Sequence, residues 1–296
     1  MEHLINIKSL STDDINKICN RASEFEKGIR RSNHINGHIA NMFFENSTRT
    51  KLSFEMAENR ISANKYNFDA NTSSINKGED IYDTINNLSA IGINAVVLRH
   101  ESNTLINELK EKTYYNTISF VNAGSGSSAH PTQALLDYYT IKKHFLDLKD
   151  KIIAITGDIV HSRVAKSNIE LLKKFNAKIR CIAPTQFQDE TLEGIDYYED
   201  INKGFENADI VMALRIQRER IAEKIDFDEY INNYQITKDN LPYNALLMHP
   251  GPVNKDIEIK SDVLSMQNAK TILKQAENGV YIRMAILDMI LSGYGI

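Results

Sequence analysis

The sequence predicts an α/β protein with two doubly wound domains, each built on a parallel sheet that helices flank. Short apolar segments alternate along the chain with longer segments of helical periodicity, which is the pattern of βαβ units. The predicted strands are apolar on both faces, as in parallel sheets that helices cover on both sides. The length of 296 residues suits two domains of roughly 150 residues each.

The individual elements follow from these two periodicities. Strands are expected where apolar or β-branched residues run together, at residues 39–44, 95–98, 117–121, 151–156, 178–183, 209–214 and 245–248. Helices are expected where apolar residues recur every three or four positions, at residues 12–25, 51–64, 132–145, 164–175 and 277–291. We place the domain boundary near Pro131, before the second series of alternating elements.

Composition and charge exclude several classes of protein. With 35 Lys and Arg against 39 Asp and Glu, the net charge is −4, so overall electrostatics favour neither nucleic acid nor an anionic membrane. Apolar stretches such as residues 93–98 are too short to span a bilayer, and residues 1–10 lack the pattern of a signal peptide. Cys19 and Cys181 each lie in an apolar pattern, which indicates buried thiols and a reducing cytoplasm.

Polar residues follow six of the seven predicted strands at the point where each strand ends. Ligands of open α/β sheets bind at the carboxyl ends of strands, so these positions form the expected site. Four of them are arginines: Arg49, Arg99, Arg163 and Arg215. Each arginine alone suits a solvated strand end, helix start or charge run, but four at one edge favour a site for anions.

Residues 47–50, Ser-Thr-Arg-Thr, lie between the first predicted strand and a helix. Unpaired N–H groups and the positive end of the helix dipole attract phosphate at such a position. The hydroxyl groups add donors, and Arg49 adds a planar guanidinium fork. A simple helix cap is the alternative, because Ser and Thr are common capping residues. A cap needs one such residue, whereas three hydroxyls flank Arg49, which favours an anion site.

Two motifs resemble those of a known family. Residues 44–50, Phe-Glu-Asn-Ser-Thr-Arg-Thr, with Phe54-Glu55 after them are similar to the carbamoyl-phosphate signature of the aspartate and ornithine carbamoyltransferases. Residues 130–137, His-Pro-Thr-Gln-Ala-Leu-Leu-Asp, resemble the second motif that this family shares. The similarity then continues through most of the chain, in the same order and spacing.

The second half of the chain resembles the aspartate enzymes of this family rather than the ornithine enzymes. Residues 157–168 and 214–220 are similar to aspartate-binding motifs, and residues 249–252, His-Pro-Gly-Pro, stand where ornithine enzymes have His-Cys-Leu-Pro. A dicarboxylic acid needs two guanidinium partners, whereas ornithine needs an acidic partner for its ammonium group. The resemblance therefore implies carbamoyl transfer from carbamoyl phosphate to L-aspartate, an early committed step of de novo pyrimidine (UMP) biosynthesis.

The resemblance also implies how the domains divide this reaction. Residues 1–131 plus 278–296 form the expected carbamoyl-phosphate-binding domain, and residues 132–277 form the expected aspartate-binding domain. The active site is expected in the cleft between them. The products are N-carbamoyl-L-aspartate and phosphate. Neither a metal nor a cofactor is implied, because phosphate is a good leaving group.

The residues of the expected site follow from the matched motifs. Catalytic roles are implied for Arg49, Thr50, His130 and Lys77. Carbamoyl phosphate is expected to contact Ser47, Thr48, Arg49, Thr50, Arg99, His130, Gln133, Gly251, Pro252 and Ser73. Aspartate is expected to contact Lys77, Arg163, Arg215 and Gln217. For His130 the residues leave an alternative, a helix cap before Pro131, which suits a first helical position.

The expectation that the chain assembles into an oligomer rests on the polar segment 72–79. Its residue types alone suit a flexible turn. By resemblance, Ser73 and Lys77 instead reach into the active site of a neighbouring subunit, which implies a homotrimer with shared sites. Regulatory subunits are a further partner that the sequence leaves open.

Three other functions stay open from the residues alone. The first is a carbamoyltransferase with another acceptor, such as ornithine. The second is a dinucleotide-binding oxidoreductase, because residues 124–129 fit the Gly-x-Gly-x-x-Ala pattern. The acidic residue that should end the next strand is missing there, since Asp150 precedes that strand. The third is a non-catalytic anion-binding or assembly protein, which would lack the full set of donors.

Overall fold

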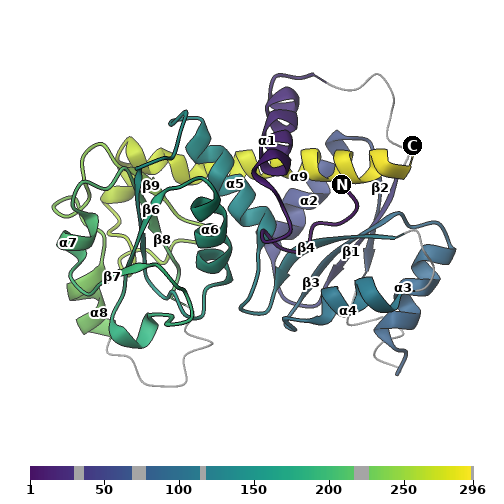
Figure 1. The fold of residues 1–296 in the computed structure, drawn as a ribbon, viewed down its shortest axis with the longest axis horizontal. Helices are drawn as coiled ribbons and strands as arrows, with labels where there is room; N and C mark the ends of the chain where they lie inside the picture. Colours follow the sequence, from purple (N-terminus) through teal and green to yellow (C-terminus); the bar gives the residue numbers. More distant parts are fainter. Residues whose placement is uncertain (30–36, 69–77, 114–117, 217–226, 295–296) are drawn as a thin grey trace. The chain divides into compact units, whose positions relative to one another are not determined.

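The computed structural model describes residues 1–29, 37–68, 78–113, 118–216 and 227–294 (Figure 1). The chain divides into two compact units: unit 1 comprises Met1–Leu135 with Asn278–Ile296, and unit 2 comprises Leu136–Glu277. Each unit contains one parallel sheet flanked by helices, which confirms the predicted α/β class. The first division falls after Leu135, a few residues beyond the expected boundary at residue 131.

The sheet of unit 1 has the strand order β2-β1-β3-β4, and its strands are parallel. The strands span Asn64–Phe68 (β2), His38–Phe43 (β1), Ala95–His100 (β3) and Ser119–Ser125 (β4). The chain leaves β1 for β2 on one side and then returns to β3 on the other side of β1. The carboxyl ends of β1 and β3 therefore flank a topological switch point, where ligands of such sheets bind.

Helices cover both faces of this sheet (Figure 1). Those wholly within unit 1 are α1 (Thr12–Glu26), α2 (Thr48–Arg60), α3 (Ile81–Ala90) and α4 (Leu105–Lys112). Met42 of β1 belongs to one buried cluster with Ile85 of α3 and Leu109 of α4. Its neighbour Asn41, on the opposite face of the strand, donates a hydrogen bond to Glu58 of α2 at 2.9 Å. Helices α3 and α4 therefore cover one face, and α2 covers the other.

The sheet of unit 2 has the strand order β7-β6-β5-β8-β9, again with parallel strands. The strands span Asp196–Tyr198 (β7), Lys178–Ile182 (β6), Ile152–Thr156 (β5), Ile210–Ala213 (β8) and Leu246–Met248 (β9). The chain runs outward from β5 to β7 and then returns to β8 and β9 on the other side of β5. The switch point of this sheet thus lies between β5 and β8.

The helices of unit 2 are α6 (Arg163–Lys174), α7 (Ile201–Phe205) and α8 (Phe227–Tyr234). Two further helices, α5 (Pro131–Lys142) and α9 (Thr271–Leu291), begin in one unit and end in the other. Short 3-10 turns lie at Thr185–Phe187, Val263–Ser265, Asn268–Lys270 and Ser292–Tyr294. Within the described residues, no helix combines the length and the apolar character that crossing a bilayer requires.

The seven predicted strands are present, each within a few residues of its expected bounds. The missed strands, β2 and β7, lie at sheet edges and have polar sequences, so they lack the apolar run that identifies a buried strand. The short helices α3, α4, α7 and α8 were also missed. The expected helix 51–64 was wrong at both ends, because α2 begins at Thr48 and ends at Arg60. Residues 48–50 therefore form the first turn of α2 and not a loop before it.

The two cysteines, Cys19 and Cys181, are buried and form no disulfide with each other, as the sequence predicts. Burial raises the pKa of the Cys181 thiol to about 12. Such a thiol stays protonated at neutral pH and is a poor nucleophile.

Candidate functional site

The carboxyl ends of β1 and β3 lie side by side in unit 1. Phe43 is paired with Arg99 in the strand register, and the Phe44 N–H donates to the Arg99 carbonyl at 2.9 Å. Residues 47–50 follow β1 closely, and Arg99 lies at the end of β3. The strand order therefore brings both predicted phosphate-binding segments to the switch point of this sheet.

Helix α2 begins with Ser47 as its N-cap and with Thr48, Arg49 and Thr50 as its first turn. Ser47 has φ −157° and ψ 80°, and among the described residues its side chain makes no capping hydrogen bond. First-turn N–H groups have no carbonyl partner within a helix, and the helix dipole adds partial positive charge beside them. This turn contains no acidic residue, and Arg49 adds a full positive charge. Such a first turn suits an anion.

Arg99 is held by groups that follow or belong to both neighbouring strands. Its Nε lies 3.0 Å from Glu45 Oε2, and its Nη1 donates to the Ala123 carbonyl at 3.4 Å. The side chains of Arg99 and Glu45 are 12% and 22% exposed, so water has limited access to this ion pair. Glu45 follows β1 and Ala123 belongs to β4. A guanidinium that is already oriented loses little conformational entropy when it binds phosphate.

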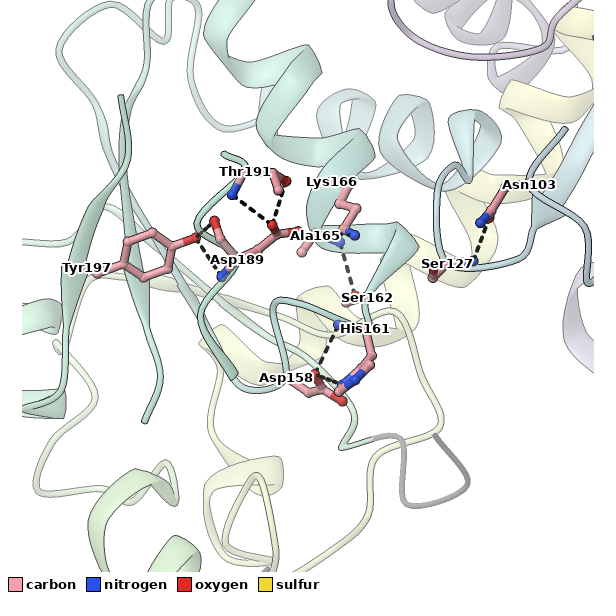
Figure 2. A network of polar contacts seen from close by, with 10 residues as sticks. All are labelled: Asn103, Ser127, Asp158, His161, Ser162, Ala165, Lys166, Asp189, Thr191 and Tyr197. Carbon is pink, nitrogen blue, oxygen red and sulfur yellow. Dashed lines mark hydrogen bonds and ion pairs between the residues drawn. The ribbon is translucent and has the colours of Figure 1, made fainter. Parts of the chain in front are cut away.

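The Gly/Ser segment after β4 closes on itself before helix α5. Ser125 and Ala129 form an antiparallel bridge, and the Ser127 N–H donates to Asn103 Oδ1 at 3.0 Å (Figure 2). Helix α5 begins after this turn, at Pro131. In a dinucleotide-binding site the helix begins within the glycine pattern itself. This turn therefore contradicts the dinucleotide-binding alternative.

His130 and Gln133 lie at the start of α5 and are both buried. The His130 carbonyl accepts the N–H groups of Gln133 and Ala134 at 3.0 and 3.2 Å, so the backbone of His130 caps the helix. Its imidazole Nδ1 lies 3.5 Å from Thr132 Oγ1. The helix-cap alternative thus describes the backbone of His130, and the role of its imidazole stays a prediction.

In unit 2 the carboxyl ends of β5 and β8 flank the switch point. The Leu214 N–H donates to the Thr156 carbonyl at 2.8 Å, next to Gly157. Gly157 has φ +121°, and a Cβ there would lie 2.9 Å from the Leu214 carbonyl oxygen, so glycine is required. Arg163 follows β5 and Arg215 follows β8, so the two arginines predicted to bind aspartate start from neighbouring strand ends.

The turn between β5 and α6 is organised by Asp158, whose side chain is buried. Asp158 Oδ1 accepts the His161 N–H at 3.2 Å and lies 2.9 Å from His161 Nδ1 (Figure 2). Ser162 then caps α6 by accepting the Ala165 N–H at 3.1 Å. Arg163, the first residue of α6, is 8% exposed. This burial contradicts the alternative of a solvated arginine at a helix start.

A second carboxylate anchors the same end of α6. Lys166 Nζ lies 3.1 Å from Asp189 Oδ2, and Thr191 donates to Asp189 Oδ1 through its N–H and its hydroxyl at 3.1 and 2.6 Å (Figure 2). The Tyr197 hydroxyl donates to the Asp189 carbonyl at 2.9 Å. These bonds join α6 to the segment after β6, which holds the helix that carries Arg163.

Arg215 is half-buried just beyond the end of β8. The next residue, Ile216, donates its N–H to Glu258 Oε1 at 3.1 Å. Glu258 also accepts the backbone and side-chain N–H groups of Asn254 at 2.8 and 2.7 Å. Burial raises the pKa of the Glu258 carboxyl, and these hydrogen bonds oppose that rise. A carboxylate far along the chain thus holds the backbone beside Arg215.

In the segment after β9, residues 249–252, both backbone N–H groups donate to side chains of the protein. The His249 N–H donates to Gln275 Oε1 at 2.9 Å, and the Gly251 N–H donates to His249 Nδ1 at 2.7 Å. Pro250 and Pro252 have no N–H, and the Gly251–Pro252 peptide bond is cis. The backbone of this segment therefore offers carbonyl acceptors to a ligand and no donors.

The predicted site residues fall into three groups. Unit 1 contains Ser47, Thr48, Arg49, Thr50, Arg99, His130 and Gln133. Unit 2 contains Arg163, Arg215, Gly251 and Pro252. The described residues do not include Ser73, Lys77 and Gln217. In the part of the chain that the structure describes, no three His, Cys, Asp or Glu side chains gather as a metal site requires.

Four polar residues with structural roles near these strand ends were given none from the sequence. They are Glu45, Asp137, Glu258 and Gln275. Asp137 carries a local signal, since it is a carboxylate one helical turn after Gln133 in an otherwise apolar stretch. The other three bind partners that are distant in sequence, so no local pattern identifies them.

Comparison with protein families matches both halves of the chain. Residues 2–143 match the profile described as "Aspartate/ornithine carbamoyltransferase, carbamoyl-P binding domain". Residues 149–290 match the profile described as "Aspartate/ornithine carbamoyltransferase, Asp/Orn binding domain". The two profiles together span nearly the whole chain, in the same order as the two units.

Individual relatives agree with the family profiles. The chain is 40% identical over 297 residues to the aspartate carbamoyltransferase catalytic subunit of Staphylococcus carnosus (strain TM300), covering 99% of this chain and 96% of that protein. The solved catalytic subunit of M. jannaschii aspartate transcarbamoylase is similar with a TM-score of 0.86 and 30% identity, covering 99% of both chains. Aspartate transcarbamoylase of Trypanosoma cruzi, solved with carbamoyl aspartate and phosphate, has a TM-score of 0.86 and 27% identity, covering 97% of this chain and 94% of that one.

Proposed function

Because the chain belongs to the aspartate/ornithine carbamoyltransferase family, we propose that it transfers the carbamoyl group of carbamoyl phosphate to L-aspartate. The products are N-carbamoyl-L-aspartate and phosphate, and the reaction is an early committed step of de novo pyrimidine biosynthesis. The similarity to a catalytic subunit of this activity over nearly the full length supports aspartate as the acceptor.

The arginines at both topological switch points are the observation that carries this proposal. In unit 1, Arg49 follows β1 and Arg99 lies at the end of β3; in unit 2, Arg163 and Arg215 follow β5 and β8. Carbamoyl phosphate brings one phosphate group, and aspartate brings two carboxylates. Guanidinium groups bind both kinds of anion through paired N–H donors. Each unit therefore has the charge that one of the two substrates needs.

The first turn of α2 is the proposed phosphate site. Its N–H groups and hydroxyls donate to the phosphate oxygens, and Arg99 donates from the neighbouring strand end. The contacts assigned to phosphate come from Ser47, Thr48, Arg49, Thr50 and Arg99. With no acidic residue in this turn, nothing in its own sequence competes with the ligand for these donors.

The carbamoyl group is assigned to a second set of donors and acceptors. Arg49, Thr50 and His130 donate to its carbonyl oxygen, on which negative charge develops during the reaction. Gln133 and the backbone carbonyls around Gly251 and Pro252 accept its NH2 group. Preoriented donors of this kind stabilise a developing oxyanion more than they stabilise the starting carbonyl.

The chemical step is an attack of the neutral α-amine of aspartate on the carbonyl carbon. A tetrahedral intermediate forms, and the C–O bond to phosphate then breaks. The amine proton passes to the departing phosphate, which leaves as the hydrogen phosphate dianion. The enzyme acts mainly by holding two anions together in the orientation that the attack needs.

Arg163 and Arg215 each take one carboxylate of aspartate, and Gln217 adds a polar contact. The buried position of Arg163 and the fixed backbone after Arg215 support this assignment, because both limit the freedom of the guanidinium groups. Lys77, from a neighbouring subunit, adds a compact positive charge between phosphate and aspartate.

The assembly that goes with this mechanism is a homotrimer with shared active sites. Ser73 and Lys77 of one subunit serve the site of the next. The support is the family resemblance of the segment 72–79, most of which lies outside the described residues. We place the reaction in the cytoplasm, in keeping with the thiols of Cys19 and Cys181, which form no disulfide with each other.

Phosphate release from carbamoyl phosphate with aspartate or with ornithine tests the proposed function. We expect turnover with aspartate and none with ornithine. Arg215→Leu is expected to lower kcat/KM for aspartate by at least about 100-fold, because one carboxylate loses its guanidinium, while carbamoyl phosphate still binds. Turnover with ornithine alone would contradict the acceptor assignment.

Arg180→Leu is a matched control in the same unit. Arg180 lies on β6 and donates to the Glu206 carbonyl at 2.6 Å and the Gly204 carbonyl at 3.4 Å, and it has no role in the proposed site. This variant also removes a guanidinium from unit 2, but we expect its KM for aspartate to stay near the wild-type value. If kcat/KM for aspartate falls equally in both variants, the effect of Arg215→Leu is general and does not support a carboxylate contact.

A further inference from the structure

The buried carboxylate of Asp137 joins three helices of unit 2. Asp137 lies on α5, one turn after Gln133, and is 0% exposed. Its Oδ2 accepts the side-chain amide of Asn168 on α6 at 2.9 Å, and its Oδ1 accepts that of Gln275 on α9 at 2.7 Å. A carboxylate is very unfavourable in a protein interior unless donors satisfy it, so these amides are needed to keep it there.

Hydrogen bonds continue from Asp137 to the segment after β9. A backbone N–H can only donate, so the carbonyl of Gln275 must face the His249 N–H at 2.9 Å, and its NH2 group faces Asp137 Oδ1 at 2.7 Å. His249 Nδ1 in turn accepts the Gly251 N–H at 2.7 Å, which requires that this nitrogen carries no proton. Gln275 and His249 are 2% and 1% exposed. Each bond therefore fixes the orientation of the next group.

We propose that Asp137, Gln275 and His249 are positioning residues that hold the backbone of Gly251 and Pro252 in the geometry that binds the carbamoyl NH2 group. This inference rests on the proposed function, in which carbonyls of this segment accept from that group. We call the hydrogen bonds from Asp137 through Gln275 and His249 to Gly251 the relay. The relay engages both backbone N–H groups of residues 249–252, so only the carbonyls of this segment remain for a donor. Helix α5, which carries Asp137, also carries Gln133, the other expected partner of the NH2 group.

Two substitutions made together, Asp137→Asn and Gln275→Glu, exchange a donor and an acceptor of this relay and leave its total charge unchanged, whereas each one alone changes the charge. Asp137→Asn places an amide opposite the amides of Gln275 and Asn168. Two donors then face each other at one of these contacts or at His249, unless the Asn168 amide turns over and gives up its bond to the Val164 carbonyl at 3.1 Å. Gln275→Glu sets a second buried carboxylate against Asp137. In the double variant the new amide at position 137 donates to the new carboxylate at position 275, which still accepts the His249 N–H. Every pairing of the wild-type relay is then restored.

The expected result is rescue. Each single variant is expected to lower kcat/KM for carbamoyl phosphate at least about tenfold, because a displacement of about 1 Å at a reacting group has effects of this size. The double variant is expected to return to within about threefold of the wild type. Single variants with wild-type kcat/KM would overturn the proposal. A double variant that regains the wild-type melting temperature but not kcat/KM would overturn it as well.

A second pair of variants applies even where the charge-altered single variants fail to fold. Gln275→Met keeps the length of the side chain, adds no charge and removes the bonds to Asp137 and His249. Asn168→Ala is its matched control, because it removes the other amide on Asp137 and leaves the Gln275–His249–Gly251 relay in place. We expect Gln275→Met to raise KM for carbamoyl phosphate at least about tenfold and Asn168→Ala to change it less than about threefold. Equal effects would show a general structural role and reject the proposal.

Wild-type phosphate release is measured first, and it separates the two levels of inference. An active wild type with unaffected variants rejects the positioning role and leaves the proposed function intact. An inactive wild type rejects both.

Discussion

Two helices of unit 1 begin with the same dipeptide, Ser-Thr, but differ in what satisfies their N-termini. At α1, the Ser11 hydroxyl accepts the Asp14 N–H at 3.1 Å, and Asp14 Oδ2 accepts the Ser11 N–H at 3.0 Å, which is a capping box. At α2 the equivalent residues are Ser47 and Thr50, and the described residues include no capping bond from the Ser47 side chain.

The difference lies in the first turn of each helix, which reads Thr-Asp-Asp in α1 and Thr-Arg-Thr in α2. In α1, Asp14 accepts the Ser11 N–H, and the negative charges of Asp13 and Asp14 favour the positive end of the helix dipole. The first turn of α2 has no carboxylate and adds a guanidinium, which suits the external anion of the proposed function. On this proposal, the charges of the first turn decide whether its N–H groups stabilise the helix or bind a ligand.

The largest expected effect comes from converting the N-terminus of α2 into that of α1. Thr50→Asp places a carboxylate at the third helical position, where it completes a capping box with Ser47 and brings negative charge into the phosphate site. We expect kcat/KM for carbamoyl phosphate to fall at least about 10³-fold. The free energy of unfolding is expected to stay equal or rise by about 0.5–1 kcal/mol. Phosphate release and urea unfolding measure the two effects.

Thr50→Val is the control for this change, because it removes the hydroxyl without adding charge. Its loss of kcat/KM is expected to be smaller, about 100-fold, as for the loss of one oxyanion donor. A Thr50→Asp protein that keeps more than a tenth of wild-type kcat/KM contradicts the assignment of this turn to phosphate.

The next effect concerns pH and a carboxylate on the inner face of α2. Glu58 is fully buried, and this burial raises the pKa of its carboxyl from 4.5 to about 7, although the Asn41 side chain donates to it at 2.9 Å. The folded state therefore binds the proton more tightly than the unfolded state. Its contribution to stability is fully present below pH 4.5 and is lost as the pH rises to about 7. The total is about 3 kcal/mol, because the pKa rises from 4.5 to about 7 and one pKa unit corresponds to about 1.4 kcal/mol.

Glu58→Gln removes this titration, because the neutral amide resembles the protonated carboxyl. Urea unfolding at pH 5 and pH 8 gives the free energy of unfolding of both proteins, and we expect the wild type to lose more of it between these pH values than the variant. In α1 the sign is opposite: the hydrogen bonds from Ser11 lower the pKa of Asp14, so its contribution is lost as the pH falls below 3.8. An identical pH dependence for wild type and Glu58→Gln would contradict the raised pKa of this buried carboxyl.

The smallest effects concern the two capping serines. Ser11→Ala is expected to lower the free energy of unfolding by about 1 kcal/mol, because it removes the capping bond to the Asp14 N–H. Ser47→Ala is expected to change it by less than about 0.5 kcal/mol, since no such bond is broken among the described residues. Its kcat/KM for carbamoyl phosphate should nevertheless fall about tenfold or more, whereas Ser11→Ala keeps full activity. Equal losses of stability in the two variants would remove the distinction between these helix ends.

The sequence predicts the buried elements well and the edge elements poorly. Residues 151–156 and 178–183 were recognised as strands because both faces of these segments are apolar, as the interior of a helix-covered sheet requires. Strand β2, Asn64–Phe68, was hidden by its polar sequence, and the helical periodicity of α2 was extended over its start. A polar edge strand is recognised by its hydrogen-bonded neighbour, and the local sequence does not identify that neighbour.

The candidate site divides in the same way. Arg49 and Arg99 were identified because arginines at the ends of parallel strands indicate a site that binds anions. Glu45, which pairs with Arg99, and Gln275, which bonds to Asp137, were given no role. Each is an ordinary polar residue in its own segment and acquires its role through contact with a partner far along the chain.

The sequence by itself determined the apolar strands, the longer helices and the residue types that can hold phosphate and carboxylates, because periodicity and side-chain chemistry are local properties. The tertiary structure decided the strand orders, which set Phe43 and Glu45 beside Arg99 and Gly157 beside Leu214. It also decided the partners of the buried carboxylates. The physical reason is that strand order and carboxylate pairing depend on close contacts between segments tens to more than a hundred residues apart, and no local pattern encodes such contacts.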